Sequence, residues 1–360
     1  MNILRLFLLP FSFIYLLVTY IRNVFYDFGI FRSYTSPIPV IALGNLSVGG
    51  TGKTPHCEFL LKLVGKSHRV AYLSRGYKRD SKGFLLIEAN TPPEQSGDEP
   101  LQVKQKFPWA IVAVCRNREK GIHQLLHLFP TLELVILDDA YQHRRVKPAF
   151  NVLLTDYRRL FVDDYLLPAG RLRESRLGYR RSDCIVITKT ERVLPVILQN
   201  HLHNVIKPLS HQLLLYSYYN YSAFKPVCKP ELQKHRKKAS HIVLFTGIEN
   251  PLPLVDYLKS LSYTVDSISF PDHHAYNQKD LKKVISLYES KPCVSRMILT
   301  TEKDLIRLET SPILKMLDPF PFYYVTIEVV FHDEGEQVLT KKVESLLSDA
   351  SAKRQLSLFS

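Results

Sequence analysis

The chain is poor in the residues that stabilise small secreted or zinc-binding domains. Its five cysteines are scattered through 360 residues, odd in number and never spaced as CxxC: Cys57, Cys115, Cys184, Cys228 and Cys293. That pattern argues against a disulfide framework and a zinc site, and it indicates a reducing compartment. A chain this long buries about three quarters of its unfolded surface, so it needs no disulfide support.

The chain is also short of acidic residues. Its 34 Asp and Glu stand against 48 Lys and Arg, which gives a net charge of +14. This surplus suits nucleic acid, an anionic membrane surface or a phosphorylated substrate, and it does not choose among them. Hydrophobic residues make up 46% and charged residues 23%. These values exclude a disordered tail, a collagen-like fibre and a multi-span membrane protein.

No uncharged run reaches the length expected of a membrane-spanning helix. Near the N-terminus, 16 uncharged residues from Leu6 to Ile21 include Pro10, whereas a span needs about 20. No small-residue cleavage site follows, which argues against a secretory signal. The run has aromatic residues and arginine flanks that suit a lipid headgroup interface: Phe11, Phe13, Tyr15, Tyr20, Phe25 and Tyr26, with Arg5, Arg22 and Arg32. We predict that residues 1–30 form a helix lying in, or dipping into, a membrane; the alternative is a buried helix of a soluble fold.

The rest of the chain alternates between apolar runs and helical patterns, which predicts an α/β fold with a parallel sheet. Predicted strands of the first part are 38–43, 70–73, 109–115, 132–137, 151–155 and 184–188, with a helix at 53–64. After a stretch rich in Pro and Lys, the pattern resumes with strands at 242–246, 264–270, 296–300 and 323–330 and a helix at 253–261.

The length and this interruption predict two domains. The predicted division is a membrane-associated helix 1–30, a sheet domain 31–224, a basic linker 225–240, a second, smaller α/β domain 241–345 and a frayed tail 346–360.

A glycine-rich segment follows the first predicted strand and opens a helix, as a phosphate-binding P-loop requires. It reads Ser47, Val48, Gly49, Gly50, Thr51, Gly52, Lys53 and Thr54. In such a loop the backbone N–H groups and the helix N-terminus hold an anion. Lys53 would reach the β- and γ-phosphates, and the Thr54 hydroxyl would ligate Mg²⁺. The strict pattern has Gly where this chain has Ser47, and an ordinary Gly-rich turn is the alternative.

The apolar run Leu134–Leu137 ends in two carboxylates, Asp138 and Asp139. In P-loop proteins a carboxylate at such a strand end holds Mg²⁺ directly or through water. The alternative is a pair of Asp residues that cap the next turn. The residues 142–145 that follow could bind phosphate or substrate, or form a solvated loop.

Two further motifs carry titratable groups. Asp98 and Pro100 precede a helical stretch, and Asp98 could cap that helix. In the second part, Asp272 is followed by His273 and His274. A histidine pair suggests a metal or acid–base chemistry, but no third ligand at a suitable spacing supports zinc.

Arginine clusters stand near predicted strand ends, where open α/β sheets bind ligands. Clustered arginines suit phosphate recognition, although a solvated surface is the alternative for each cluster. The residues are Arg75 with Tyr77, Arg116 with Arg118, and Arg171, Arg173 and Glu174.

Together these motifs resemble the tetraacyldisaccharide 4'-kinase family, the lipid A 4'-kinases of Gram-negative bacteria. The matching segments occur in family order: GNLSVGGTGKTP (44–55), SRGY (74–77), GDEP (97–100), LDDAYQHRR (137–145), PAGRLRE (168–174), FTGIENP (245–251), FPDHH (270–274) and TEKD (301–304). They cover most of residues 1–305, and Ser47 belongs to the family's own P-loop. Ala140 and Lys147-Pro148 depart from the family pattern, which leaves the local geometry after Asp139 open.

The resemblance implies an enzyme with a P-loop NTPase-like domain, a second α/β domain and an N-terminal membrane helix. The implied activity is ATP- and Mg²⁺-dependent phosphorylation of the 4'-hydroxyl of a tetraacylated glucosamine disaccharide 1-phosphate in lipid A biosynthesis. The implied place is the cytoplasmic face of the bacterial inner membrane, with its anionic surface and the lipid-linked substrate as partners. No nucleic acid or protein partner is expected.

The resemblance also implies roles for single residues. Asp98 matches the catalytic carboxylate and His273 its partner histidine. The metal and nucleotide are expected at Thr54, Asp138, Asp139 and Glu174. The arginine clusters described above, and not the resemblance, place the acceptor substrate at Arg75, Tyr77, Arg116, Arg118 and Arg173.

Two other functions remain open from the sequence. A P-loop GTPase or ATPase could act as a switch or carrier at the membrane, and Thr188-Lys189-Thr190-Glu191 is weakly similar to a guanine-reading element, with Glu191 in the place of Asp. The net charge also suits nucleic acid, but the chain has no aromatic-basic RNA module and no helix-turn-helix signature.

Overall fold

The computed structural model describes residues 3–77, 79–227, 229, 231–232, 239–272, 274–290, 295–309 and 311–358. The chain forms two compact units. Unit 1 contains residues 1–220 and 329–360, and unit 2 contains residues 221–328. Two chain connections therefore join the units, one on each side of the inserted unit 2.

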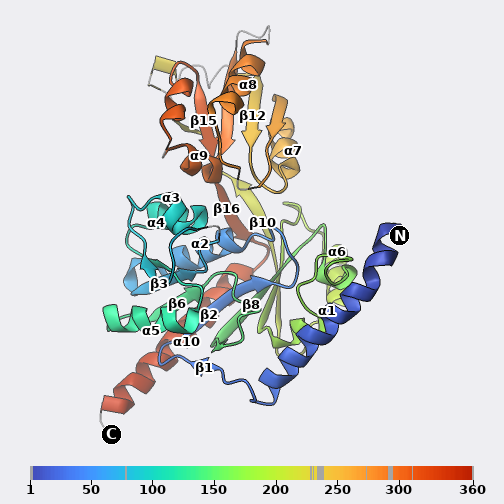
Figure 1. The fold of residues 1–360 in the computed structure, drawn as a ribbon, viewed down its shortest axis with the longest axis vertical. Coiled ribbons are helices and arrows are strands. Elements are labelled where there is room, and N and C mark those ends of the chain that lie inside the picture. Colours follow the sequence, from blue (N-terminus) through green and yellow to red (C-terminus); the bar gives the residue numbers. More distant parts are fainter. Residues whose placement is uncertain are drawn as a thin grey trace. The chain divides into compact units, whose positions relative to one another are not determined.

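Unit 1 is built on a nine-stranded sheet (Figure 1). Strands β10, β9, β8, β2, β6, β3 and β5 run parallel in that order. At one edge β4 is antiparallel to β5, and β16 forms the other edge. From β16 to β4 the strands are Ile327–Phe331, Leu213–Tyr221, Cys184–Thr188, Phe150–Asp156, Val40–Asn45, Leu134–Leu137, Val70–Ser74, Ile111–Val114 and Leu85–Leu86. Strand β2 lies in the middle, so its carboxyl end is flanked by those of β6 and β8.

The central strands are buried on both faces, as expected of a parallel sheet covered by helices. Leu73 and Leu137 pack with Leu125 of α5 in one core cluster, and Ile185 packs with Leu202 of α6 in another. The helices of this part are α2 (Lys53–Val64), α3 (Pro93–Ser96), α4 (Asp98–Lys106), α5 (Arg118–Leu128) and α6 (Val196–Ile206). A separate two-stranded parallel sheet pairs β1 (Tyr34–Thr35) with β7 (Val146–Lys147). The predicted parallel α/β fold is confirmed.

Unit 2 has its own five-stranded sheet in the order β11-β15-β14-β12-β13. All neighbours are parallel except β11 and β15. Along β12, Ile242 and Leu244 join one core cluster, whereas Val243 and Phe245 join another. The elements are β11 (Lys225–Pro226), β12 (His241–Thr246), α7 (Leu252–Ser260), β13 (Thr264–Ser269), α8 (Gln278–Glu289), β14 (Arg296–Thr301), α9 (Glu302–Glu309) and β15 (Phe322–Val325). This is the second, smaller α/β domain that the sequence predicts.

The boundaries of the units differ from the predicted ones. The predicted strand 323–330 is two strands, because β15 of unit 2 ends at Val325 and, after Thr326, β16 enters the sheet of unit 1. Residues 346–358 of the predicted tail are part of helix α10 (Gly335–Leu358), which belongs to unit 1. Leu339, Val343 and Leu347 of α10 are buried at a spacing of four, which gives the helix one apolar face to pack.

The described residues of the predicted linker 225–240 belong to unit 2 and do not form a linker between the two units. Lys225 and Pro226 form β11 and pair with Tyr324 and Tyr323 of β15, so they belong to the sheet of unit 2. Much of the remaining stretch, including Cys228, lies outside the described residues.

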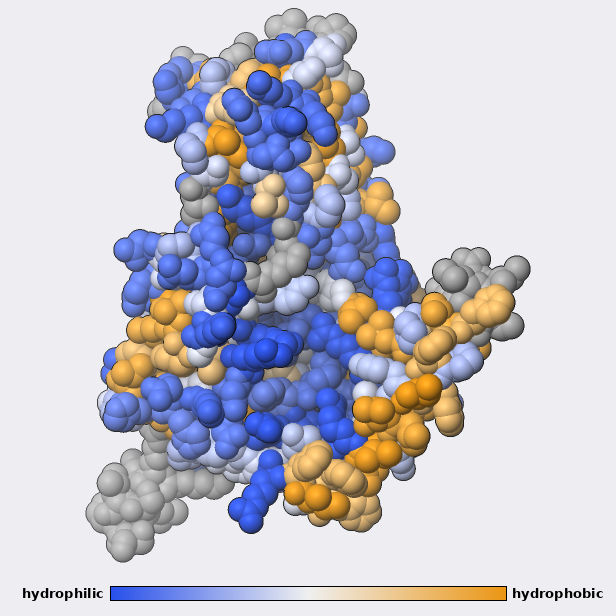
Figure 2. All heavy atoms as spheres, viewed as in Figure 1, coloured by the Kyte–Doolittle hydropathy of each residue, from blue (hydrophilic) through white to orange (hydrophobic). Residues whose placement is uncertain are grey.

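The N-terminal helix α1 (Ile3–Asp27) carries apolar side chains on its outer surface. Its residues 7–27 have the length and composition of a membrane-crossing helix, and 11% of that segment is buried. The large side chains exposed along it are Phe7, Leu9, Phe11, Phe13, Ile14, Leu17, Val18, Tyr20, Ile21 and Phe25. Figure 2 shows them as an orange band along the helix.

The opposite face of α1 is polar and packs on the rest of unit 1. Its polar residues recur every three or four positions, which places them on one side of the helix: Ser12, Tyr15, Thr19 and Asn23. Ser12 Oγ donates to the carbonyl of Leu166 at 3.1 Å, and Tyr15 Oη donates to the carbonyl of Arg173 at 2.9 Å. The helix is therefore held by hydrogen bonds while its apolar residues point outward, which is the reverse of a buried helix in a soluble fold.

Candidate active site

The predicted P-loop connects the carboxyl end of β2 to the N-terminus of α2. Asn45, the last residue of β2, is fully buried, and its Nδ2 donates to the Gly49 carbonyl at 3.3 Å and to Thr51 Oγ1 at 3.0 Å. Gly52 has φ +91°, and a Cβ there would collide with the hydroxyl of Tyr219. The loop is thus fixed from inside by an amide side chain, and glycine is required where helix α2 begins.

The two predicted carboxylates lie beside this loop, because β6 pairs with β2 in parallel register. Asp138 is 2% exposed and accepts a hydrogen bond from the hydroxyl of Tyr72 through Oδ2 at 2.6 Å. Its Oδ1 is buried and has no hydrogen-bond partner among the described residues. Burial, with the charge of Glu99, raises the pKa of Asp138 to about 6, although the Tyr72 hydrogen bond opposes this.

Asp139 has the opposite electrostatic environment. Its carboxylate is 3.6 Å from Lys53 Nζ and 3.0 Å from Arg173 Nη1. Burial alone raises its pKa, but the charges of Lys53 and Arg173 outweigh burial, so the pKa of Asp139 is lowered. The pKa values of these two adjacent carboxylates are therefore shifted in opposite directions.

These residues fit a magnesium ion bound together with nucleotide phosphates. Mg²⁺ in such sites is held by one or two carboxylates, substrate phosphates and water, and the buried, unpartnered Oδ1 of Asp138 is an oxygen suited to it. Thr54, the other expected oxygen ligand, is buried at the start of α2. Among the described residues no three His, Cys, Asp or Glu form a metal-binding group.

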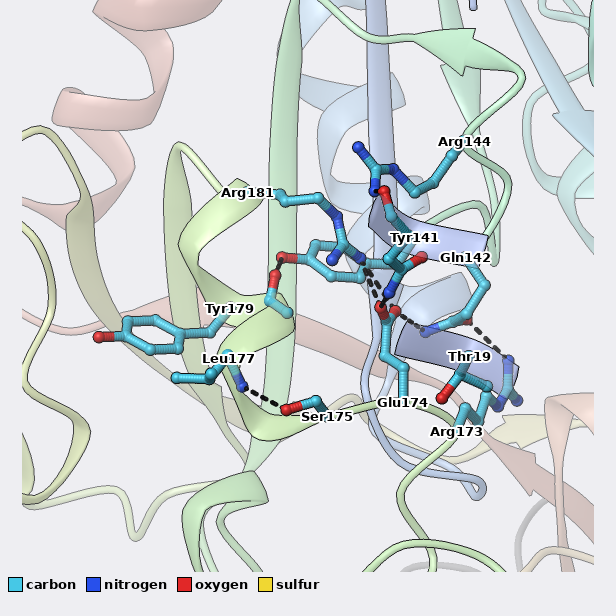
Figure 3. Close-up of polar contacts among 12 residues, drawn as sticks. Thr19, Tyr141, Gln142, Arg144, Arg173, Glu174, Ser175, Leu177, Tyr179 and Arg181 are labelled. Atoms are coloured by element: carbon cyan, nitrogen blue, oxygen red, sulfur yellow. Dashed lines mark hydrogen bonds and ion pairs between the residues drawn. The ribbon is translucent and has the colours of Figure 1, made fainter. Parts of the chain in front are cut away.

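Glu174 does not join this pair of carboxylates, contrary to the predicted metal set. It is fully buried, and its carboxylate accepts hydrogen bonds from Arg181 at 2.9 Å, Gln142 at 3.1 Å and Asn23 at 2.9 Å. Figure 3 shows the carboxylate enclosed between Arg181 and Gln142. Protein donors thus occupy both of its oxygens, and Glu174 forms an ion pair with Arg181.

The GDEP segment (97–100) lies beside the SRGY segment (74–77), which begins at the carboxyl end of β3 in the same sheet. Gly97 has φ +83°, and a Cβ there would be 3.2 Å from the carbonyl of Tyr77, so the SRGY and GDEP segments meet at this glycine. Helix α4 begins at Asp98, and its N-cap position is Gly97, with no side-chain cap. Asp98 is thus not the predicted helix cap. The next residue, Glu99, contributes its charge to the raised pKa of Asp138, which places this helix start near the end of β6.

Comparisons with known proteins show which family the chain belongs to. A family model described as tetraacyldisaccharide-1-P 4'-kinase matches residues 4–345. The chain belongs to this family. The tetraacyldisaccharide 4'-kinase of Phocaeicola vulgatus is 40% identical over 342 residues, which cover 93% of each chain. That of Flavobacterium johnsoniae is 42% identical over 331 residues, covering 92% of this chain and 94% of the relative.

A solved structure shares the fold. It is LpxK from Aquifex aeolicus, described as being in complex with ATP. It is 30% identical, covers 96% of this chain and 100% of that chain, and has a TM-score of 0.72. The family assignment identifies this chain as a kinase of lipid A biosynthesis, and it does not favour the switch or carrier alternative.

Within this 4'-kinase fold, the predicted substrate arginines differ in accessibility. Arg118 is 2% exposed, and its guanidinium donates to the carbonyls of Cys115 and Asp138 at 3.1 and 2.8 Å. It therefore supports the end of β6 from inside, which contradicts its predicted role as a substrate ligand. Arg75 and Arg116 are exposed.

Tyr77 and Arg173 complete the predicted acceptor set. Tyr77 is 61% exposed. Arg173 is partly exposed and pairs with Asp139, because its segment runs antiparallel to the P-loop, with a bridge between Ser47 and Leu172.

In unit 2 the family motifs converge on one buried carboxylate. Asp304 of the TEKD segment is fully buried and accepts hydrogen bonds from the Gly247 amide at 3.0 Å, the Tyr276 hydroxyl at 3.0 Å and Arg307 at 3.0 Å. The FTGIENP turn and the segment after FPDHH are thereby held to the start of α9. His273, the predicted catalytic partner, lies outside the described residues.

Several residues of this site have no motif that would have revealed them. Asn45 lies in the matching family segment 44–55 but carried no predicted role, and Tyr72 reads in sequence as an ordinary strand residue. Lys189 lies in the segment that is weakly similar to a guanine-reading element. Its Nζ donates to the carbonyl of Gly50 and pairs with Asp156 at 2.8 Å. In the structure it supports the P-loop backbone from the end of β9.

Proposed function

We propose that this 4'-kinase transfers the γ-phosphoryl group of ATP to the 4'-hydroxyl of a tetraacylated glucosamine disaccharide 1-phosphate. The observation that carries the proposal is the P-loop beside Asp138 and Asp139, with Lys53 paired to Asp139. Phosphoryl transfer is catalysed mainly by positioning and by stabilising the charge on the moving group. Lys53 supplies the stabilising positive charge once the nucleotide phosphates replace Asp139 as its partner.

We further propose that Mg²⁺ is held by Asp138, Thr54 and the nucleotide, where it neutralises charge on the phosphates. The raised pKa of Asp138 supports this, because a buried carboxylate with a free oxygen gains most from a cation. Asp139 serves a different purpose: its pairing with Lys53 and Arg173 keeps both cations at the mouth of the loop before the nucleotide arrives.

We assign the acceptor side to Asp98, which would take the proton of the sugar hydroxyl, and to His273, which would orient it. A base must lie within hydrogen-bond reach of that proton, and the start of α4 stands near the nucleotide carboxylates through Glu99. The exposed Arg75, Tyr77 and Arg116, with Arg173, would bind the anionic and polar groups of the acceptor.

We infer that α1 lies in the plane of the membrane, at the cytoplasmic face of the bacterial inner membrane. Its polar face is hydrogen-bonded to unit 1 while its apolar residues are exposed. A helix held along its side by a folded domain cannot cross the bilayer alone, but it can bury its outer face at the headgroup boundary. The net charge of +14 favours anionic lipid on the same side.

The test is transfer of labelled phosphate from ATP to the tetraacylated disaccharide 1-phosphate in detergent micelles. We expect Mg²⁺-dependent product with wild-type enzyme and little with Lys53→Ala. Rapid ATP hydrolysis that ignores the acceptor would contradict the proposal and favour a nucleotide switch.

A further inference from the structure

A polar chain links the membrane helix to the nucleotide site, and the buried Glu174 stands at its centre. We propose that Glu174 is a positioning residue that couples the docking of α1 to the geometry of the P-loop and Asp139. The proposal rests on the kinase function proposed above. It gives Glu174 a role different from the metal ligand expected from the sequence.

The first link joins α1 to Glu174. Asn23 lies on the polar face of α1, and its Nδ2 donates to Glu174 Oε2 at 2.9 Å. Arg144 binds the same end of the helix: it donates to the Asn23 carbonyl at 2.8 Å and pairs with Asp27 at 2.5 Å. A cation at this end also favours the helix dipole. The C-terminal turn of α1 is therefore fixed to the segment that follows β6.

The second link joins Glu174 to the nucleotide site. Glu174 Oε1 accepts from Gln142 Nε2, which also donates to the carbonyl of Asn45 at 2.7 Å, immediately before the P-loop. Gln142 Oε1 accepts from Arg173 Nη1 at 3.4 Å, and the same nitrogen binds Asp139 at 3.0 Å. Figure 3 shows Gln142 between Glu174 and Arg173.

The burial of Glu174 makes this chain sensitive to small changes. Glu174 is fully buried, and Arg181 donates to both of its oxygens at 2.9 Å while its guanidinium lies over the ring of Tyr141. The Tyr141 hydroxyl in turn donates to the carbonyl of Gly178 at 2.7 Å. A buried carboxylate bound by three side-chain donors has few alternative arrangements. Losing the Asn23 contact therefore shifts Gln142 and Arg173 and does not simply leave a gap.

The experiment compares full-length Asn23→Ala, Glu174→Gln and the double variant in the micellar transfer assay. The matched control is Ser12→Ala, which removes two other hydrogen bonds between α1 and the rest of unit 1, to the carbonyl of Leu166 and from the amide of Ala169, neither of which leads to Glu174. We expect Asn23→Ala and Glu174→Gln each to lower kcat by about 3- to 30-fold, the range of energetic coupling through such networks. The KM for the lipid acceptor stays within about twofold, and Ser12→Ala keeps the wild-type kcat.

A reciprocal pair tests the contact itself. Asn23→Asp places two carboxylates together and lowers kcat more than Asn23→Ala. Combining Asn23→Asp with Glu174→Gln restores a donor and an acceptor, and part of the kcat returns. The Asn23→Ala/Glu174→Gln double variant loses less than the product of the single losses, because the two residues act through one contact.

Several results would overturn the coupling. These are unchanged kcat per folded enzyme with a lower melting temperature, multiplicative losses in the double variant, or an equal loss in Ser12→Ala. An increased Mg²⁺ requirement confined to Glu174→Gln would return that residue to the metal site. If Glu174→Gln does not fold, wild-type kcat in Asn23→Ala overturns the proposal by itself.

Binding of a fluorescent ATP analogue to the same variants needs no acceptor. We expect it to weaken in Asn23→Ala and Glu174→Gln and not in Ser12→Ala. Absence of lipid phosphorylation by the wild-type enzyme would refute the proposed function, whereas unchanged nucleotide binding across the variants would refute the coupling.

Discussion

Asp138 and Asp139 are adjacent, yet their neutralisation should change stability in opposite directions. Burial and the charge of Glu99 raise the pKa of Asp138 from 3.8 to about 6, so the ionised carboxylate destabilises the folded protein at neutral pH. Each unit of pKa corresponds to about 1.4 kcal/mol, which gives about 3 kcal/mol at most for Asp138. Asp138→Asn removes this penalty and keeps an oxygen for the Tyr72 hydroxyl. For a unit of this size the melting temperature should rise by roughly 6–10 °C at pH 7.5.

The pH dependence follows from the sign of the shift. The folded pKa of Asp138 is above the unfolded value, so the penalty is complete above about pH 6 and absent below about pH 4. The gain from Asp138→Asn should therefore shrink as the pH falls from 7 to 4. Asp139 is the matched control: although burial raises its pKa, Lys53 and Arg173 lower it overall, so its charge stabilises the fold above its unfolded pKa. Asp139→Asn should lower the melting temperature at pH 7.5.

The assay is thermal unfolding followed by circular dichroism, without ATP or Mg²⁺, at several pH values. Phosphoryl transfer is measured on the same preparations and should be nearly lost in Asp138→Asn despite the higher stability. Stabilisation by Mg²⁺ and ATP should be smaller in Asp138→Asn than in wild type, because the cation loses a ligand. A decrease in melting temperature for both variants at pH 7.5 would refute the opposite tuning of the two carboxylates.

Three further predictions concern the reaction and the membrane. Lys53→Ala should lower transfer at least about 10²- to 10³-fold with an unchanged circular dichroism spectrum; near-normal turnover would reject the nucleotide site. Removing residues 1–24 should reduce pelleting with anionic vesicles and raise the KM for the lipid, while kcat falls no further than in Asn23→Ala; full pelleting at high salt would exclude α1 as the main anchor. Asp98→Ala and His273→Ala should each lower kcat by about 10²- to 10⁴-fold with less than multiplicative losses together; unchanged kcat with lower thermal stability would show structural roles.

Contiguous patterns in the sequence were enough for the nucleotide loop and for six strands of the unit 1 sheet, whereas β4 and β10 were not predicted. An apolar strand followed by glycines, Lys53 and Thr54 uses backbone geometry that neighbouring residues create by themselves. The strand ending in Asp138 and Asp139 was equally clear, and parallel pairing with β2 then brings its end to the loop. The sequence also predicted two α/β units and an N-terminal helix, since periodicity reports which residues are buried.

The tertiary structure alone decided what the polar side chains contact. Arg118 and Glu174 look like exposed ligands in sequence, but both are buried; Arg118 donates to the end of β6, and Glu174 accepts from Asn23 of α1. Periodicity shows that a side chain faces inward, yet it does not show which element meets it there. For the same reason the sequence could not show that Asp138 and Asp139 have opposite electrostatic environments, or that the polar face of α1 is the one that binds unit 1. Those properties depend on charges and donors brought together by long-range packing, which no local pattern records.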